Sequence, residues 1–303
     1  MHLILVRMRS HNVFWWYLCL TLVLGIYSCS NDDEQDLSAV PDEQTEIPEP
    51  EGNSPDPQPE EGEDVLGTVE FLNPDLVDDH YILVNDAGAN RAYIMDKQAR
   101  LLHEWKLTNN IGNDVFLLPD GRVLASLESD EPKINIGGKG GQLQIIGPDN
   151  TVEWKFLYSS ELAETHHDAE LLPNGNIIAM VWEKRTAQEA SDGGCMVSID
   201  LYPEAIIEID PNTDEIVWEW HSWEHLIQDY DESKSNFGVV GDHPELIDIN
   251  YVPKSGDWPE EDGDIMHANA ISYDPVNDVI FLSVNFFSEV WVIDHSTTTE
   301  EAT

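Results

Sequence analysis

Short apolar runs rich in β-branched and aromatic residues alternate with turn residues through most of the chain. The clearest unit lies between His166 and Trp220, where such runs flank the turns Pro173-Asn174-Gly175 and Asp210–Asp214. Runs of this length, bounded by Pro, Asn, Asp and Gly, predict β-strands joined by hairpin turns. We therefore expect an antiparallel four-stranded sheet here, with two adjacent histidines in its first strand.

The same order of runs and turns recurs along the chain. The units begin near Tyr81, Asp114, His166 and His267, and the first three close on Trp105, Trp154 and Trp218. The closing tryptophans are 49 and 64 residues apart, the longer interval containing an insertion at residues 183–203. Four-stranded repeats of roughly 40 to 50 residues predict an all-β fold of β-propeller blades, with the tryptophans packed between neighbouring sheets. An irregular β-sandwich is the alternative.

The fourth unit has no closing strand and no closing tryptophan. The residues after Asp294 are polar and short of apolar runs as far as Thr303. A propeller closes its ring to bury the edges of its terminal blades. We therefore expect about three and a half blades in this chain and a longer natural protein, with a closed small propeller of irregular end as the alternative.

Residues 1–29 predict a lipoprotein signal peptide. Arg7 and Arg9 precede the apolar run Val13–Ile26, and a small residue stands before Cys29, the expected lipidation site. The prediction is an outer membrane lipoprotein that faces the periplasm or the cell surface, touching the membrane only through its lipid anchor. An ordinary cleaved signal or an uncleaved anchor is the alternative.

Residues 30–66 predict an extended linker, because they are acidic and rich in proline. The folded domain is then 67–303, and Cys195 has no partner in it for an intramolecular disulfide. The net charge of −46, from 60 acidic and 14 basic residues, excludes nucleic acid and an anionic membrane surface as partners. Because the charge is spread over every segment, we interpret it as adaptation to a salty medium rather than as a site for a cationic ligand.

Two histidine motifs carry the candidate chemistry. One is His166-His167-Asp168, followed by Leu171-Leu172-Pro173-Asn174-Gly175, and the other is the run Asp264–Asp274, which contains His267 and Asn269. Together they resemble the arylsulfotransferases, the PAPS-independent aryl-sulfate sulfotransferases, over residues 67–303. The resemblance implies an exported six-bladed β-propeller that passes a sulfuryl group from an aryl sulfate donor to a phenolic acceptor through a sulfated histidine. It implies no cofactor and no metal.

Sulfuryl transfer fits these residue types, because imidazole is a nucleophile when neutral and a hydrogen-bond donor when protonated. By resemblance, His167 and His267 bind the sulfuryl oxygens or carry the phenol proton. Asp168 or Asp264 would orient the rings, and Asn269 would support them. For His166 a structural hydrogen bond at a strand start is the simpler interpretation.

Two departures from the family pattern bear on activity. The family has an arginine eighteen residues after the second histidine, where this chain has Asn285. The resemblance also places the sulfated histidine in a blade after Thr303, and His295 is a poor substitute for it. A non-catalytic surface propeller that binds a ligand or a protein partner is therefore the alternative function, and a quinoprotein-type propeller is a third.

Other motifs predict ordinary structure. Gly137–Gly141 lacks the spacing of a phosphate loop, so we expect a flexible loop there. Asp210–Asp214 lacks the closing Glu of a calcium loop and predicts a hairpin turn. The run Trp218–His225 fits either an aryl pocket or the core, and residues 230–251 predict a long insertion between blades.

Overall fold

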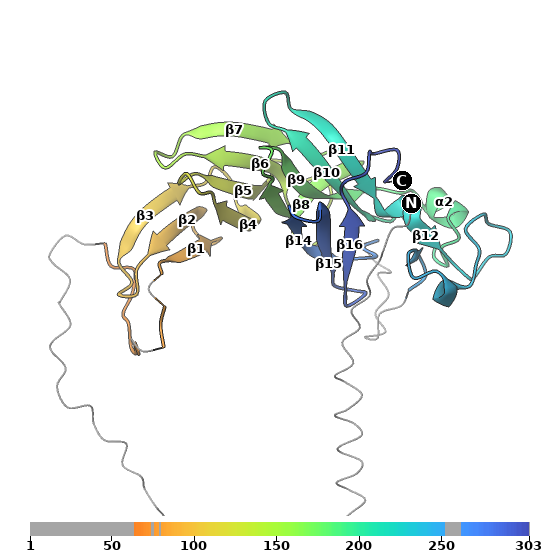
Figure 1. Cartoon of the computed structure of the whole chain (residues 1–303), viewed down its shortest axis with the longest axis horizontal. Helices are drawn as coiled ribbons and strands as arrows, with labels where there is room; N and C mark the ends of the chain where they lie inside the picture. Colours follow the sequence, from red (N-terminus) through yellow and green to blue (C-terminus); the bar gives the residue numbers. More distant parts are fainter. Residues whose placement is uncertain (1–63, 74–75, 79, 252–261, 303) are drawn as a thin grey trace, which may run out of the picture. The chain divides into compact units, whose positions relative to one another are not determined.

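The computed structural model describes residues 64–73, 76–78, 80–251 and 262–302 (Figure 1). The predicted signal peptide, the lipidation residue Cys29 and the predicted linker up to residue 63 lie outside this part of the chain. Within it, the regular structure is almost entirely β-sheet. None of the helices described there is long and apolar enough to cross a membrane.

The first two sheets are antiparallel and follow the order of the chain, β1-β2-β3 and β4-β5-β6-β7. Their strands are β1 (Ile82–Asp86), β2 (Arg91–Met95), β3 (Leu101–Lys106), β4 (Ile111–Leu117), β5 (Val123–Glu128), β6 (Gly141–Ile146) and β7 (Val152–Leu157). The turn Pro119-Asp120-Gly121 joins β4 to β5. Gly121 closes it with φ of +87°, a left-handed conformation that glycine adopts without steric cost.

The next two sheets have the orders β11-β10-β9-β8 and β14-β15-β16, again antiparallel. Their strands are β8 (Ala163–Leu171), β9 (Ile177–Glu183), β10 (Glu204–Asp210), β11 (Glu215–His221), β14 (Ala268–Asp274), β15 (Val279–Val284) and β16 (Glu289–Asp294). The predicted hairpin at Asp210–Asp214 joins β10 to β11. As the sequence predicted, the fourth sheet ends with a third strand at Asp294.

Two insertions add small elements to the third sheet. The first, between β9 and β10, contains α2 (Ala187–Asp192), whose start is closed by a capping box between Thr186 and Glu189. The second follows β11 and contains η1 (Ser222–His225), β12 (Leu226–Ile227), η2 (Val240–Asp242) and β13 (Ile247–Asp248), with β12 and β13 paired in parallel. These correspond to the insertions expected at 183–203 and 230–251.

Consecutive sheets pack face to face through separate apolar clusters. Trp105 is buried between the first and second sheets, Trp154 packs against the cluster between the second and third, and Trp218 is buried between the third and fourth. The predicted position of the closing tryptophans is therefore confirmed. Antiparallel sheets stacked in chain order are the arrangement of β-propeller blades.

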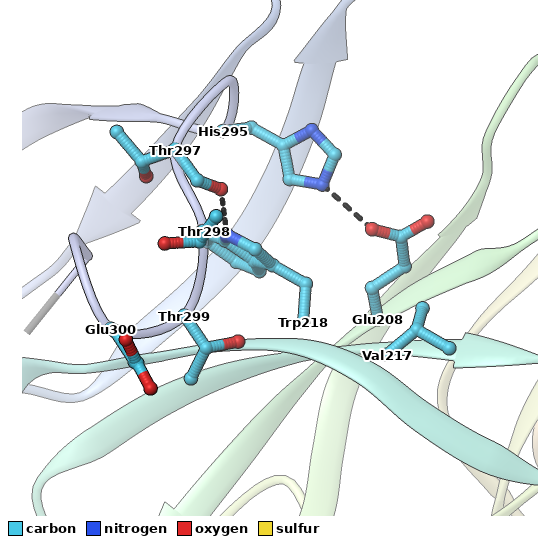
Figure 2. Close-up of a pocket in the computed structure, with 8 residues that line it drawn as sticks. All are labelled: Glu208, Val217, Trp218, His295, Thr297, Thr298, Thr299 and Glu300. Carbon is cyan, nitrogen blue, oxygen red and sulfur yellow. Dashed lines mark hydrogen bonds and ion pairs between the residues drawn. The ribbon is translucent and has the colours of Figure 1, made fainter.

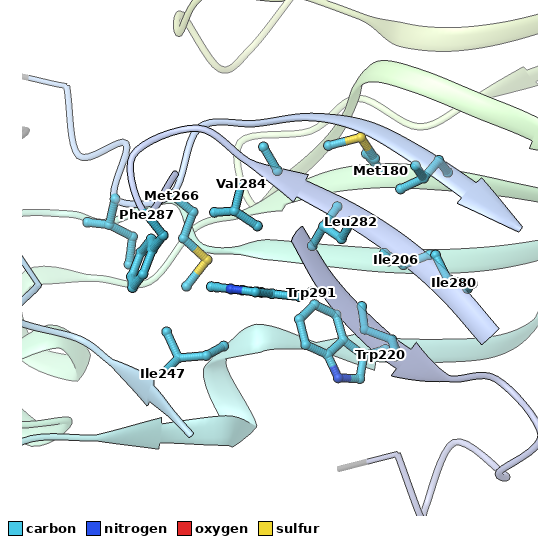
Figure 3. Packing of buried hydrophobic residues seen from close by; sticks show 14 of the residues in the cluster. Met180, Ile206, Trp220, Ile247, Met266, Ile280, Leu282, Val284, Phe287 and Trp291 are labelled. Atoms are coloured by element: carbon cyan, nitrogen blue, oxygen red, sulfur yellow. The ribbon is translucent and has the colours of Figure 1, made fainter. Parts of the chain in front are cut away.

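The interface between the third and fourth sheets forms the largest cluster (Figure 3). Met180 and Ile206 of the third sheet meet Leu282 and Trp291 of the fourth, and all four are almost completely buried. Trp220 is also buried in this cluster. Trp220 thus belongs to the core, and Trp218 is buried in the same cluster.

The first strands of neighbouring sheets lie side by side, β8 contacting both β4 and β14. Each of these three strands has an irregular register, at Ile111/Val115 in β4, His166/Ala169 in β8 and Ala268/Ala270 in β14. Irregularities of this kind bend a strand and redirect its side chains. Two of them fall on the histidine motifs.

Candidate active site

The β8 irregularity separates the directions of its two histidines. His167 has φ of +47°, a left-handed conformation that is uncommon for a residue other than glycine. His166 is fully buried, whereas His167 keeps 8% of its surface exposed. Their rings stand nearly perpendicular, with Nδ1 of one ring 2.9 Å from Nδ1 of the other. Only His167 thus reaches solvent, and His166 lies behind it.

His166 is held between an aromatic ring and a carboxylate. Its ring stacks on Trp182 of β9 with centroids 4.0 Å apart, and its Nε2 lies 2.7 Å from Oε2 of Glu204 in β10. Glu204 and Trp182 are cross-strand partners, so their side chains share one face of the third sheet. The other carboxylate oxygen of Glu204 accepts the backbone N–H of Ala268 at 3.0 Å. Glu204 therefore joins the two histidine segments.

His267 lies just before β14 and is oriented by Asp264. Its Nδ1 is 2.5 Å from Oδ2 of Asp264, and its backbone N–H donates to Oδ1 of the same carboxylate. The ring stacks on Phe286. Like His167, His267 has a left-handed backbone conformation, with φ of +50°. We expected Asp168 or Asp264 to orient the imidazole rings, and Asp264 is the carboxylate that lies in position to orient His267.

His167 and His267 face each other across the junction of β8 and β14. Their ring centroids are 5.9 Å apart. The side-chain amide of Asn269 in β14 lies 3.3 Å from Nε2 of His167. Four of the predicted site residues, His167, His267, Asp264 and Asn269, are thus brought together with His166.

The glycine loop before β6 forms a wall of this site, although we expected a flexible loop. The backbone N–H of His167 points to the carbonyl of Gly138, which has φ of +82°. A Cβ at Gly138 would stand 1.9 Å from Cε1 of His167, and one at Gly137 would stand 3.9 Å from Cε1 of His267. The loop therefore passes so close to both imidazoles that position 138 has no room for a side chain.

Two predicted site residues serve different purposes. Asp168 accepts the backbone N–H of Ile271 at 2.9 Å, which ties β8 to β14, and burial raises the pKa of its carboxyl to about 6. Asn285 is exposed after β15, and its backbone N–H donates to the carbonyl of His267. Its neutral amide supplies no fixed positive charge beside the histidines.

Burial sets the protonation of the buried pair. It lowers the pKa of His166 and His167 to about 3, since an imidazolium there would lose its hydration. Burial also raises the pKa of Glu204 well above its ordinary value, and the nearby Asp264 adds to the rise. At His267 the hydrogen bond with Asp264 raises the pKa. The site combines neutral imidazoles with one that favours its protonated form.

This arrangement can bind and protonate an anionic group. Protonated His267 presents a ring N–H donor, and neutral His167 presents either a lone pair or an N–H, depending on its tautomer. Within the described ranges there is no group of three or more His, Cys, Asp or Glu residues that could hold a metal ion.

Glu204, Trp182 and Gly138 escaped prediction from the sequence. Glu204 stands at the start of an apolar strand, two residues before the buried Ile206 and on the same face. An acidic residue at an inward position of a central strand is the signal that identifies it, because a buried carboxylate needs a partner. Neither Trp182 nor Gly138 has such a signal.

A further histidine, His295, lines a pocket formed by β10, β11 and the segment after β16 (Figure 2). His295 has both ring nitrogens bound by carboxylates, Nε2 by Glu208 at 2.9 Å and Nδ1 by Asp278 at 2.8 Å. Both nitrogens then act as donors, which leaves no lone pair for nucleophilic attack. The remaining lining comes from β11 and the segment after β16: Val217, Trp218, Thr297, Thr298, Thr299 and Glu300.

Comparison with solved structures finds several of low similarity. A protein of unknown function from Bacteroides caccae is 14% identical, with 72% of this chain and 55% of that chain covered and a TM-score of 0.38. A europium-containing methanol dehydrogenase is 14% identical, with 68% of this chain and 33% of that chain covered and a TM-score of 0.35. A hypothetical protein from Leishmania major is 11% identical, with 70% of this chain and 60% of that chain covered and a TM-score of 0.32. The chain spans about half the length of the first of these structures.

Comparison with curated proteins gives no match. The model of the arylsulfotransferase (ASST) family, in contrast, matches residues 68–300. This range contains all the strands described above and both histidine motifs. The chain belongs to the arylsulfotransferase family.

Proposed function

We propose that the protein is an exported arylsulfotransferase that moves a sulfuryl group from an aryl sulfate to a phenol by histidine chemistry. The observation that carries the proposal is the convergence of His167 and His267 from neighbouring first strands, with ring centroids 5.9 Å apart. Each ring is fixed from behind, His267 by Asp264 and His167 by His166. Membership of the family supplies the reaction class.

In this proposal the two imidazoles have different tasks. The hydrogen bond with Asp264 raises the pKa of His267 and so favours its protonated form. Protonated His267 donates its Nε2–H to an oxygen of the sulfuryl group. His167, neutral through burial, exchanges a proton with the phenolic oxygen through Nε2. The acceptor loses its O–H proton as its oxygen bonds to sulfur, and the donor oxygen gains one as its bond to sulfur breaks.

Neither histidine has to be the group that carries the sulfuryl. The family resemblance assigns that step to a histidine other than these two. Both histidines described here would act on it from the side, as a donor to sulfuryl oxygen and as an acid or base. The neutral Asn285 leaves the fixed charge of the family's arginine unreplaced, so His267 carries more of the charge stabilisation.

The test is transfer of the sulfuryl group from 4-nitrophenyl sulfate to phenol, followed by the release of nitrophenolate. We expect turnover that requires phenol, and His267→Ala lowers it by about 10²-fold or more. His243→Ala is the matched control, since His243 lies at the surface with Glu245. Equal activity in the His267→Ala protein would refute the assignment.

A binding propeller without activity is the second candidate, and the exposed amide at Asn285 favours it. Folded protein that binds 4-nitrophenyl sulfate in calorimetry but releases no nitrophenolate would establish this alternative. For the cellular location, we propose an outer membrane lipoprotein anchored through Cys29. Labelling of the expressed protein by a fatty acid, lost in Cys29→Ala, is the measurement that decides it.

A further inference from the structure

We propose that Glu204 and His166 form a proton relay behind His167, which passes the proton of the phenol to a buried carboxylate and returns it to the next leaving group. This inference rests on the proposed sulfuryl transfer and adds to it two positioning residues that do not touch substrate. The contacts that carry it are the 2.7 Å distance from Glu204 Oε2 to His166 Nε2 and the 2.9 Å distance between the two Nδ1 atoms.

The three groups form an unbroken line from the core to the site. Glu204 is 1% exposed and His166 is not exposed at all, so both groups lie away from bulk solvent. His167 is the end that reaches solvent, and its Nε2 faces Asn269 and the His267 ring. Stacking on Trp182 fixes the His166 ring in the plane in which both of its nitrogens are engaged.

Two arrangements of protons satisfy every contact in this line. In the first, ionised Glu204 accepts Nε2–H of His166, and Nδ1 of His166 accepts Nδ1–H of His167, which leaves a lone pair on His167 Nε2. In the second, protonated Glu204 donates to His166 Nε2, His166 Nδ1–H donates to His167, and His167 Nε2 carries the proton. The two differ by one proton, and both imidazoles are neutral in each.

The first arrangement receives the proton of the acceptor. The phenol O–H breaks and Nε2–H of His167 forms. Nδ1–H of His167 breaks and Nδ1–H of His166 forms, and Nε2–H of His166 breaks as O–H of Glu204 forms. The electron pair stays on the phenolic oxygen, which attacks sulfur. When the next donor's aryl oxide leaves, the same steps in reverse deliver the proton to it.

Burial favours this route over protonation of His167. An imidazolium at either position is disfavoured, since burial lowers both imidazole pKa values to about 3, while burial raises the pKa of Glu204. A proton entering at His167 is therefore held best at the carboxylate. The amide nitrogen of Asn269, 3.3 Å from His167 Nε2, fits the lone pair of the first arrangement.

Other charged groups surround the relay and act on its titration. Asp264 and His267 face it from the segment before β14, and Glu164 faces it from β8. Glu164 is buried on the same sheet face, where it accepts the backbone N–H of Lys133 and the hydroxyl of Ser159. It lies beside the line without belonging to it, which makes Glu164→Gln the matched control.

The test is a pH titration of the chain with ¹⁵N-labelled histidine, in which ring nitrogens with and without a proton are distinguished. We expect His166 and His167 to stay neutral from pH 5 to pH 8 and to exchange tautomers together at one pH value. Glu204→Gln should hold the second arrangement at every pH, because its amide donates to His166 and its oxygen keeps the Ala268 N–H. Glu164→Gln should retain the exchange.

Protonation of either imidazole in this range, or tautomers that do not change in the wild-type chain, would overturn the relay. This measurement needs no turnover, so it stands or falls separately from the sulfotransferase proposal, and the wild-type titration decides even where Glu204→Gln does not fold. In an active form, Glu204→Gln should slow transfer to phenol by about 10²-fold. Transfer to a nitrophenol already ionised at the assay pH should change little, and an equal loss with both acceptors would also overturn the relay.

Discussion

The histidine site depends on backbone conformations that most residues avoid. His167 and His267 both have positive φ, and Gly138 at +82° lies against the His167 ring. For a residue other than glycine the left-handed region costs roughly 1 to 2 kcal/mol. Surrounding hydrogen bonds, such as those that the Asp264 carboxylate accepts from the backbone and ring of His267, hold these conformations in place. The site is thus oriented before any ligand arrives.

Gly138→Ala should damage the site more than the fold. The new Cβ would stand 1.9 Å from Cε1 of His167, so the imidazole has to move away from His166 and Asn269. We expect transfer activity to fall by about 10²-fold, the range that a misplaced acid–base group costs. Urea unfolding and the nitrophenolate assay measure the two effects.

Gly121→Ala is the control for backbone strain alone. Gly121 has φ of +87°, and a Cβ there meets nothing within 4 Å. It should lose about 1 to 2 kcal/mol of stability and keep its activity. If both variants lose the same activity at equal stability, the close approach of Gly138 to His167 has no functional meaning.

At the scale of elements, the ion pairs of His295 join the third and fourth sheets. His295, after β16, forms ion pairs with Glu208 of β10 and with Asp278 in the turn between β14 and β15. Burial opposes the charge on His295, but the two carboxylates outweigh it and raise its pKa. Burial likewise opposes the charge on Glu208, yet hydrogen bonds with His295, Asn176 and Asn174 lower its pKa to about 2.

The ion pairs of His295 should contribute to the free energy of unfolding only within a defined pH range. Because the folded pKa of Glu208 is depressed, its contribution is present above about pH 4.5 and is lost as the pH falls toward 2. The pKa of His295 is raised, so its contribution is present below about pH 6.5 and is lost as the pH rises through the folded value. We therefore expect His295→Ala to lower the free energy of unfolding most between these limits, by about 3 kcal/mol.

Urea unfolding of wild-type and His295→Ala protein at pH 3, 5.5 and 9 measures this difference. The loss should be largest at pH 5.5 and smaller at both extremes. His243→Ala, at a surface pair with Glu245, should stay within about 0.5 kcal/mol of wild type. A loss that is the same at all three pH values would mean that His295 acts by packing alone.

Elements were predictable from the sequence where the pattern is local. The strands around Pro173-Asn174-Gly175 and the closing tryptophans follow from runs and turns within one unit. The roles of the two histidine motifs were expected from the family resemblance instead. Register and contacts between units do not follow from such patterns. Glu204 is 38 residues from His166, and Gly138 meets His167 from the preceding sheet, so neither contact follows from periodicity. The bulge that separates His166 from His167 has no sequence signal that we recognise.

At the scale of the whole molecule, the charge of −46 opposes the compact state. Like charges spread over every segment repel one another, and the repulsion depends on ionic strength. The ion pairs described above neutralise few of them, since the chain has 14 basic and 60 acidic residues. The protein should therefore be more stable in salt than in dilute buffer.

Raising NaCl from 0.05 M to 0.5 M at pH 7.5 should raise the Tm, because the screening length falls severalfold over this range. We expect an increase of at least about 2 °C, the shift that roughly 1 kcal/mol produces in a domain of this size. At pH 4.3 many carboxylates are protonated, so the same addition of salt should have a smaller effect. Calorimetry at both pH values separates this repulsion from a general exclusion of salt, which would raise Tm equally. A Tm independent of salt at pH 7.5 would contradict adaptation of the chain to a salty medium.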